Sequence, residues 1–304
     1  MRELESRTQQ LVGGRTGSNG VVDTMMIPAL DKLPVDLGAG DVVFPVLHGP
    51  YGEDGTIQGM LELAGIPYVG SGVLASAVGM DKVTMKKIFT FHGLPQVEWL
   101  SLTRKEWEED RKRLAREIEA SLGYPCFVKP SNLGSSLGIS KATDRGELQA
   151  ALDAAADLDR RIIIEQGVDA REIEVSVLGN EEAQVSVPGE ILVFEHEFYD
   201  YEAKYTEGNT RLVVPAQIPG GVAKELRYIA QVAYAAIDAA GMARVDFFLE
   251  SGGTERLLLN EINTIPGFTL TSIYARLWAA SGFSYEQLLD RLIQLALERH
   301  GSGS

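Results

Sequence analysis

Residues 244–263 read RVDFFLESGGTERLLLNEIN, two apolar runs separated by a glycine-containing turn, and this stretch decides the fold. The alternation along each run predicts two antiparallel strands joined as a hairpin. It places Arg244 and Asp246 on one face of the first strand, and Glu261 and Asn263 on one face of the second. If the turn SGGT is symmetric, Arg244 opposes Glu261, and Asp246 and Glu261 are diagonal neighbours.

The polar residues of this hairpin lie inside strands that otherwise resemble core strands. Two carboxylates and one amide carbonyl suit Mg²⁺ far better than zinc when phosphate oxygens and water complete the octahedron. The alternative is a surface hairpin with an ordinary salt bridge. Unpaired charges within core-like strands would be costly, so the pattern favours metal ligation by Asp246, Glu261 and Asn263.

A second stretch, FVKPSNLGSSLGISK at residues 127–141, is an apolar strand that runs into a loop rich in Ser and Gly. It is not a P-loop, because that motif places its lysine at the end of the loop, directly before Ser or Thr. Lys129 on the strand, with backbone N–H groups of the loop 135–138, can still bind phosphate. Taken alone, the stretch is more often an ordinary turn.

The remaining pattern predicts mixed helices and strands. Residues 41–47 indicate a buried strand, 56–65 a helix and 66–71 a second strand, which together form a βαβ unit. Asp81 is a plausible N-cap for a helix over 82–93. The charged segment 105–123 is predicted to be one amphipathic helix with Trp107 and Ile118 in its apolar stripe.

Composition limits the class of protein. The chain has 304 residues, and its 45% hydrophobic content is ample to build two or three domains. With 28 basic and 43 acidic residues, its formal charge of -15 disfavours nucleic acid and anionic membrane surfaces as partners. A single cysteine, Cys126, excludes an internal disulfide, and no apolar run is long enough to span a membrane. We therefore expect a cytoplasmic location.

Other chemistries find little support in the motifs. Four histidines, with neither an HExxH motif nor a cysteine pair, give no ligand set for catalytic zinc. There is no GxSxG nucleophile elbow. The glycines of GGRTGSNG follow no predicted strand, so a dinucleotide fingerprint is not indicated.

Several motifs, in order, resemble those of the D-alanine:D-alanine ligases of the ATP-grasp superfamily. They are HGPYGEDGTIQGMLELAGIPYVGSG, GMDKVTMK, FVKPSNLGSSLGISK, FYDYEAKY, ARVDFFLE and LNEINTIPGFTLTS. The resemblance implies an ATP-grasp fold of α/β and α+β domains: an incomplete N-terminal βα domain over 1–80, a central domain over 81–175 and a catalytic domain over 176–300, with a flexible tail at 301–304. The last two domains would clasp ATP.

The resemblance also implies roles for individual residues. The ATP contacts would be Lys82, Lys129, Ser135, Ser136, Glu165, Glu172, Lys204 and Asn260. Arg244, Ser135, Tyr205 and Lys204 would be catalytic. His48, Tyr205, Arg244, Gly267 and Ser272 would contact the amino-acid substrates. It agrees with the metal ligands inferred from the hairpin, and implies two Mg²⁺ ions, with Mn²⁺ a possible replacement.

The activity implied is ATP-dependent formation of D-alanyl-D-alanine through a D-alanyl phosphate, for peptidoglycan precursor synthesis, by a homodimer. Tyr205 favours the dipeptide over the ester D-alanyl-D-lactate. A depsipeptide-forming relative, another ATP-grasp carboxylate-amine ligase and a non-catalytic nucleotide-binding form are the alternatives. The family's N-terminal His-Glu-Val-Ser motif is not found in this sequence. We therefore expect ligation by this chain to be impaired more than nucleotide binding.

Overall fold

Two antiparallel sheets organise the chain, for which a computed structural model describes residues 41–134, 137–193, 210–251 and 256–302. The smaller sheet has the strand order β1-β4-β2-β3, with β1 at Trp99–Thr103, β4 at Arg161–Gln166, β2 at Cys126–Pro130 and β3 at Ser140–Ala142. The larger follows β10-β9-β5-β7-β8, and β6 also pairs with β5. Its strands are β5 (Ala170–Gly179), β6 (Gln184–Val185), β7 (Gly189–Val193), β8 (Thr210–Val213), β9 (Gly241–Glu250) and β10 (Leu257–Asn263).

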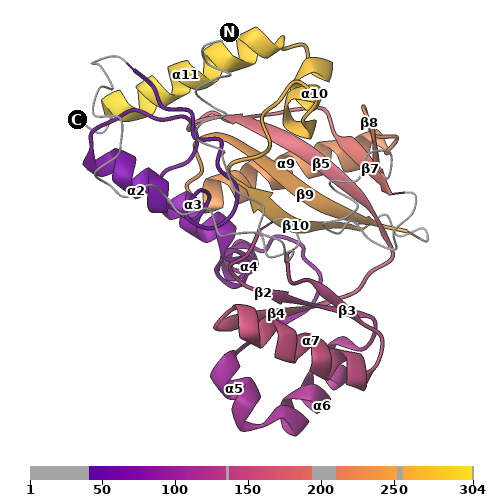
Figure 1. The fold of residues 1–304 in the computed structure, drawn as a ribbon. Helices are drawn as coiled ribbons and strands as arrows, with labels where there is room; N and C mark the ends of the chain where they lie inside the picture. The colour runs from indigo at the N-terminus through magenta and orange to yellow at the C-terminus, as the bar shows by residue number, and fades with distance from the viewer. Residues whose placement is uncertain (1–40, 135–136, 194–209, 252–255, 303–304) are drawn as a thin grey trace, which may run out of the picture. The chain divides into compact units, whose positions relative to one another are not determined.

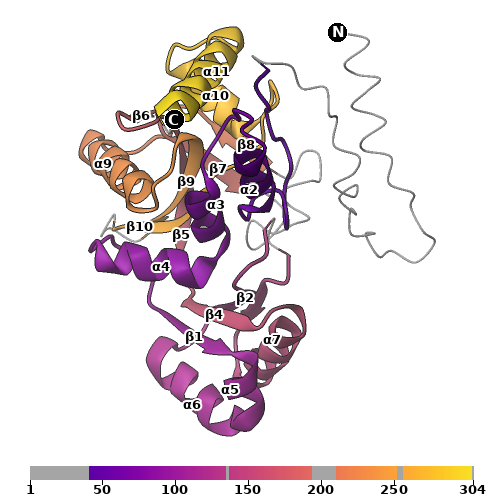
Figure 2. The ribbon, with the colours of Figure 1, turned by 90° about the vertical axis from the view of Figure 1, so that its left-hand side faces the viewer.

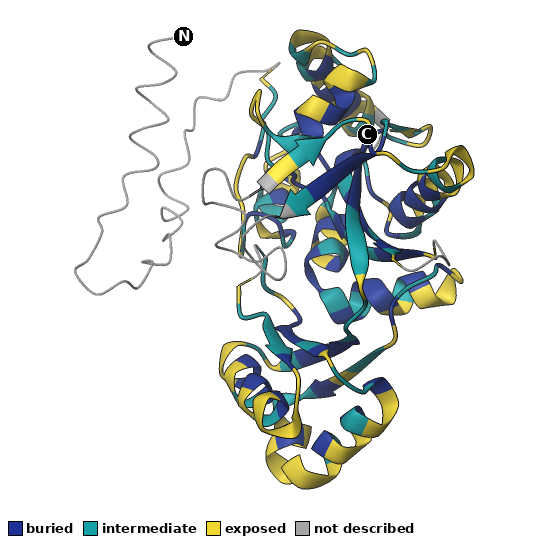
Figure 3. Ribbon diagram, turned by 90° about the vertical axis from the view of Figure 1, so that its right-hand side faces the viewer, coloured by how far each residue is buried: buried dark blue, intermediate teal, exposed yellow. Residues whose placement is uncertain are grey.

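Three helices cover the smaller sheet: α5 (Arg104–Glu109), α6 (Arg111–Leu122) and α7 (Arg145–Leu158). Their inner sides form one core with the sheet around Trp107 and Ile118, while their outer sides are exposed, as Figure 3 shows. The single helix expected over 105–123 is wrong. Asp110, whose φ is -151° and ψ is 67°, ends α5, and its side chain then caps α6 by accepting from the N–H of Arg113.

The larger sheet is covered on both faces (Figures 1 and 2). On one face, α4 (Lys82–Phe91) and α9 (Gly220–Ala236) pack on apolar side chains such as Val175 and Phe247. On the other face, α10 (Ile273–Ala280) and α11 (Tyr285–Ser302) pack on Leu178 and Met242. Because neighbouring residues of a strand alternate between faces, the polar residues 172, 174, 244 and 246 project away from the α9 core.

The N-terminal part of the described chain differs from the expected βα pattern. Its helices are α2 (Thr56–Leu63) and α3 (Val73–Met80), and the latter was not predicted. The strands expected at 41–47 and 66–71 are reduced, in the described residues, to one parallel bridge between Val43 and Tyr68. Pro45 and Pro67 have no N–H to donate, which keeps the ladder from extending.

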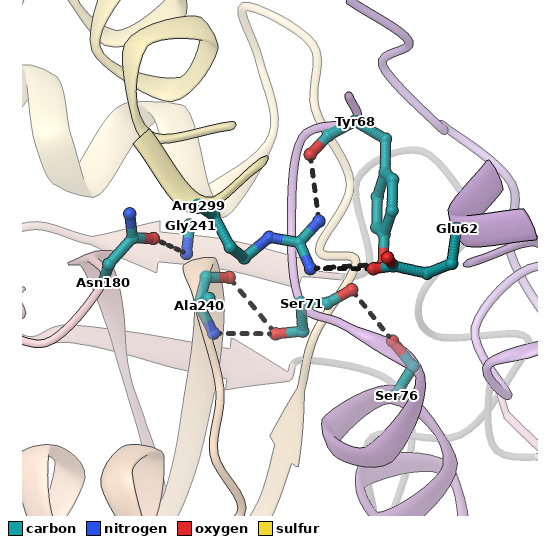
Figure 4. A network of polar contacts seen from close by, with 8 residues as sticks. All are labelled: Glu62, Tyr68, Ser71, Ser76, Asn180, Ala240, Gly241 and Arg299. Carbon is teal, nitrogen blue, oxygen red and sulfur yellow. Dashed lines mark hydrogen bonds and ion pairs between the residues drawn. The ribbon is translucent and has the colours of Figure 1, made fainter. Parts of the chain in front are cut away.

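This segment is held against the larger sheet by a polar network, shown in Figure 4. The Arg299 guanidinium on α11 stacks 4.2 Å from the centre of the Tyr68 ring and donates to the Tyr68 hydroxyl at 3.2 Å. That hydroxyl donates to Glu62 at 2.7 Å. The Ser71 hydroxyl both donates to the carbonyl of Ala240 and accepts from its N–H.

The expected domain limit at residue 175 falls inside β5, every residue of which pairs with β9 in the larger sheet. The two sheets are instead separated by residues 167–169, between the end of β4 and the start of β5. The domain limits themselves stay a prediction. In the described part of the chain, no helix has the length and apolar content needed to cross a membrane.

Replacing Arg299 by Met should lower the free energy of unfolding by about 1–3 kcal/mol, because the stacking on Tyr68 and three hydrogen bonds, to the Tyr68 hydroxyl, the Tyr68 carbonyl and Glu62, are lost. Urea denaturation followed by circular dichroism measures this. Arg291→Met removes an exposed pair with Glu298 and is the control, expected to cost less than about 1 kcal/mol. Equal effects of the two changes would contradict the importance of the network.

Candidate functional site

The hairpin β9–β10 carries a β-bulge that decides which side chains face the site. Leu257 pairs with Leu249 and Leu259 with Phe247, but Glu261 pairs with Asp246, so the register shifts at Asn260. Leu257, Leu259 and Ile262 all belong to the core under α9, which means that the alternation changes phase at the bulge.

The register predicted from a symmetric turn is therefore wrong, and the shift at Asn260 is the physical reason. Asp246 and Glu261 are directly opposite rather than diagonal, and Arg244 is opposite Asn263. Without the extra residue, Glu261 would share a face with Leu259 and point into the core. The bulge thus turns Glu261 and Asn263 toward the same side as Arg244 and Asp246.

Arg244 is fixed by two carboxylates. Its Nε and a terminal nitrogen donate to the two oxygens of Asp246 at 2.7 and 2.6 Å, and Nε lies 3.2 Å from Glu174 on β5. Burial alone would lower the pKa of Arg244, but Asp246 and Glu174 outweigh it and raise that pKa well above its usual value. The guanidinium is therefore a permanent, oriented positive charge.

The three metal ligands predicted from the hairpin lie together on β9 and β10. Glu261 lies 3.9 Å from the Lys82 ammonium, and the Asn263 side-chain oxygen accepts from the N–H of Ile265 at 2.9 Å. Among the described residues, no group of three or more His, Cys, Asp or Glu side chains is arranged for a metal. Two carboxylates with amide oxygens are nevertheless hard donors that fit Mg²⁺. Since Arg244 holds both Asp246 oxygens, a metal would have to share them.

A pocket of about 400 Å³, here called the inter-sheet pocket, is lined by residues of both sheets. Its apolar lining includes Val97, Phe127, Ile139 and Phe248. Four of the predicted ATP contacts also line it, namely Lys129, Glu165, Glu172 and Asn260. An apolar slot edged by cations and carboxylates suits a flat heterocycle that carries a polar, charged tail.

Glu165 is a deeply buried charge of this pocket. It forms ion pairs with Lys129 and, at 2.8 Å, with Lys86 of α4. Burial by itself would raise the pKa of Glu165, but Lys129 and Lys86 overcome that effect and lower it to about 2. Burial likewise opposes the charge of Lys129, yet Glu165 raises the pKa of this lysine. Glu165 and Lys129 are therefore both ionised.

A second pocket of about 460 Å³, the arginine pocket, adjoins the first, since Ile139 and Glu261 line both. The other predicted residues that line it are His48, Lys82, Arg244, Asn263, Gly267 and Ser272. Lys82 donates to the carbonyl of Leu133 at 2.8 Å. Ser272, the residue before α10, accepts from the N–H of Thr269 at 2.8 Å.

His48 and Glu53 close one side of the arginine pocket. The His48 Nδ1 lies 3.7 Å from Glu53, which also accepts from the N–H of Gly49. The interaction of the His48 ring with the acceptor carboxylate of Glu53 raises the pKa of His48, against the opposing effects of burial and of Arg244. A histidine cation here would add to the positive charge of Arg244 and suit a carboxylate ligand.

Comparisons with known proteins identify the family. Residues 88–294 match the family model described as D-ala D-ala ligase C-terminus, and residues 9–71 match the one described as D-ala D-ala ligase N-terminus. The chain belongs to the D-alanine:D-alanine ligase family. The resemblance inferred from the motifs is thereby confirmed.

Individual members of the ligase family support this. The chain is 55% identical over 260 residues to a D-alanine–D-alanine ligase of Heliobacterium modesticaldum, covering 86% of this chain and 70% of the relative. It is 50% identical over 287 residues to that of Bacillus licheniformis, covering 94% and 78%.

Solved structures of ligases confirm the ATP-grasp fold. The D-alanine-D-alanine ligase from Coxiella burnetii matches with a TM-score of 0.75 and 37% identity, covering 86% of this chain and 69% of that one. The VanG D-Ala:D-Ser ligase from Enterococcus faecalis also matches with a TM-score of 0.75, at 40% identity, covering 84% and 73%.

The structure describes most of the ligase residues predicted from the motifs, and these line the two pockets. Ser135, Ser136, Lys204 and Tyr205 lie outside the described residues, so their predicted roles stay predictions.

Three residues that contact the predicted site residues were not found from the sequence. Glu53 contacts His48, Glu174 contacts Arg244, and Lys86 contacts Glu165. Lys86 could have been found from the sequence, since it lies one helical turn after Lys82 and shares its side of α4. Glu174 could also have been found, because it alternates with the apolar residues of β5.

Replacing Glu53 by Gln should lower the pKa of His48, because the carboxylate that favours the imidazolium is removed while the size of the side chain is kept. Titration of the histidine ring signals by NMR measures the change. Asp54→Asn, in the same turn, is the control and should leave the His48 titration unchanged. An unchanged His48 pKa in Glu53→Gln would contradict the assigned contact.

Proposed function

We propose that this chain is an ADP-forming ligase that joins two molecules of D-alanine. The observation that carries the proposal is the position of Arg244, a fixed cation in the arginine pocket, which meets the inter-sheet pocket at Glu261. A phosphate donor in one pocket and a carboxylate acceptor in the other would come together there. Relatives at 50% and 55% identity are named D-alanine–D-alanine ligases, which supports the same substrates.

In the first step of the proposed reaction, a carboxylate oxygen of one D-alanine attacks the γ-phosphorus of ATP. The bond from that phosphorus to the bridging oxygen breaks, and its electrons leave with ADP. Lys82 and Lys129 offset the negative charge of the phosphates, while Lys204 is predicted to reach the γ-phosphate. The main contribution of the protein is to position the two anions against each other.

In the second step, the amine of the other D-alanine attacks the acyl carbon of D-alanyl phosphate. An oxyanion forms, the bond to phosphate breaks, and the nitrogen loses a proton as the amide forms. In this proposal Arg244 stabilises the oxyanion, and Ser272 with the backbone at Gly267 holds the second carboxylate; the three residues line one pocket, which supports these roles. Loop closure by Ser135, Ser136 and Tyr205 would exclude water.

Magnesium is proposed as the metal, with Mn²⁺ as a substitute, and Asp246, Glu261 and Asn263 would hold it. When bound, such ions neutralise phosphate charge and align the transferring group. The two hydrogen bonds between Arg244 and Asp246 orient Arg244 and also hold the Asp246 carboxylate in place on β9.

The finer features expected from the family also remain proposals: a homodimer, a cytoplasmic location and a role in building peptidoglycan precursors. D-Alanyl-D-lactate formation is the alternative reaction, and nothing in the described site favours it. The VanG relative is named for D-serine, so that amino acid belongs among the tested second substrates.

The chain should release ADP and phosphate in equal amounts only when D-alanine is added to ATP and Mg²⁺, with one D-alanyl-D-alanine formed per ADP. With D-alanine present, adding D-lactate should give ester product more than about tenfold more slowly, because the site is proposed to act on an amine. Coupled ADP detection and mass spectrometry measure both. L-Alanine is the control. ADP binding without D-alanine-dependent ADP release would instead support the non-catalytic form.

Replacing Glu261 by Gln should lower kcat by about 100-fold or more, because a charged oxygen ligand of the proposed metal is lost, while unfolding is little changed. It should also reduce the gain in ADP affinity that Mg²⁺ gives, measured by calorimetry with and without the ion. Glu250→Gln, at the far end of β9, is the control. A Glu261→Gln variant with full activity and an unchanged Mg²⁺ effect would remove Glu261 from the metal site.

A further inference from the structure

Lys86 is a buried charge to which the proposed reaction assigns no role. We propose that Lys86 is a positioning residue, which holds Glu165 by one oxygen and thereby leaves the charge of Lys129 available to the phosphates of the nucleotide. The inference rests on the proposed function, because that function supplies a nucleotide to the inter-sheet pocket.

The geometry makes Glu165 a bridge between two lysines. The Lys86 ammonium lies 2.8 Å from Oε1 of Glu165, and the Lys129 ammonium contacts Oε2. The side chains are 1% exposed for Lys86, 4% for Glu165 and 11% for Lys129. Among the described residues, Lys129 and Glu165 line the inter-sheet pocket, whereas Lys86 lies behind Glu165. Lys86 can therefore reach a nucleotide only through Glu165.

The charges explain why a second lysine is useful. A pair of Lys129 and Glu165 alone would be neutral, so a phosphate group would compete with Glu165 for the same ammonium. With Lys86 the cluster carries a net positive charge, and Glu165 keeps a partner when Lys129 turns to a phosphate. The low pKa of Glu165, about 2, agrees with a carboxylate that two cations share.

Packing alone gives no reason for Lys86. Burying an ammonium group is costly, and a methionine of similar length would fill the same space without that cost. Lys82 and Lys86 also lie one turn apart on α4, so one helix presents a lysine to each pocket: Lys82 directly and Lys86 through Glu165.

The test compares ADP with adenosine, which has no phosphate. Lys86→Met should weaken ADP binding at least tenfold by calorimetry, yet change the affinity of adenosine, measured by competition, less than twofold. Lys87→Met, at the exposed neighbouring position, is the matched control and should change neither. Thermal unfolding confirms that the variants are folded, and Lys86→Gln replaces Lys86→Met if the latter is not.

A double-mutant cycle separates positioning from packing. In a Glu165→Gln background, Lys86→Met should change the ratio of ADP to adenosine affinity less than twofold, because no carboxylate remains to draw in Lys129. The inference is overturned if Lys86→Met affects both ligands equally, if it leaves ADP affinity unchanged, or if its effect persists in the Glu165→Gln background. These are binding measurements. If the wild-type chain binds ADP but forms no dipeptide, the proposed reaction is contradicted, whereas the inference about Lys86 is not.

Discussion

Strand alternation forces a choice of face on every side chain of β9 and β10, and the bulge at Asn260 resolves that choice in favour of the site. Before the bulge, Leu257 and Leu259 enter the core under α9; after it, Ile262 does so and Glu261 does not. A regular hairpin would force either a carboxylate into that core or a leucine out of it. The single extra residue lets the same strand serve the core at one end and the site at the other.

The short connection from β4 to β5 brings polar residues of the two sheets to one pocket. Glu165 is near the end of β4 in the smaller sheet, and Glu172 is near the start of β5 in the larger one. Residues 167–169 are all that separates the two strands, and Gly167, Val168 and Asp169 themselves line the inter-sheet pocket. The chain therefore makes part of the wall of that pocket from its own crossing between sheets.

Local sequence predicted the parts of the fold that local forces decide. The N-cap at Asp81 is present, as is the hairpin predicted over 244–263, and the polar hairpin residues share one side. The predictions were wrong where the local structure depends on contacts with residues distant in the sequence or on a balance of several effects. The sequence LLLNEIN does not show which residue forms the bulge, because the position of the bulge depends on which side chains are more stable in the core and which on the opposite face of the sheet. Pro45 and Pro67 limit the ladder only because the segments around Val43 and Tyr68 pair with each other. Asp110 lies within a helical pattern of apolar residues, but it is more stable as the N-cap of α6.

The two sheets differ in the charge that they present to the pockets between them. The larger sheet contributes four carboxylates to the pockets, Glu172, Glu174, Asp246 and Glu261, against the one arginine Arg244, so that side attracts cations and holds Arg244 in place. The smaller sheet, with α4, contributes the four lysines Lys82, Lys86, Lys129 and Lys141 against the carboxylate of Glu165, so that side attracts anions. A triphosphate accompanied by divalent cations has both kinds of surface. Neither sheet alone could balance such a ligand, whereas the two sides together would, so the charges of both sheets are needed to bind it.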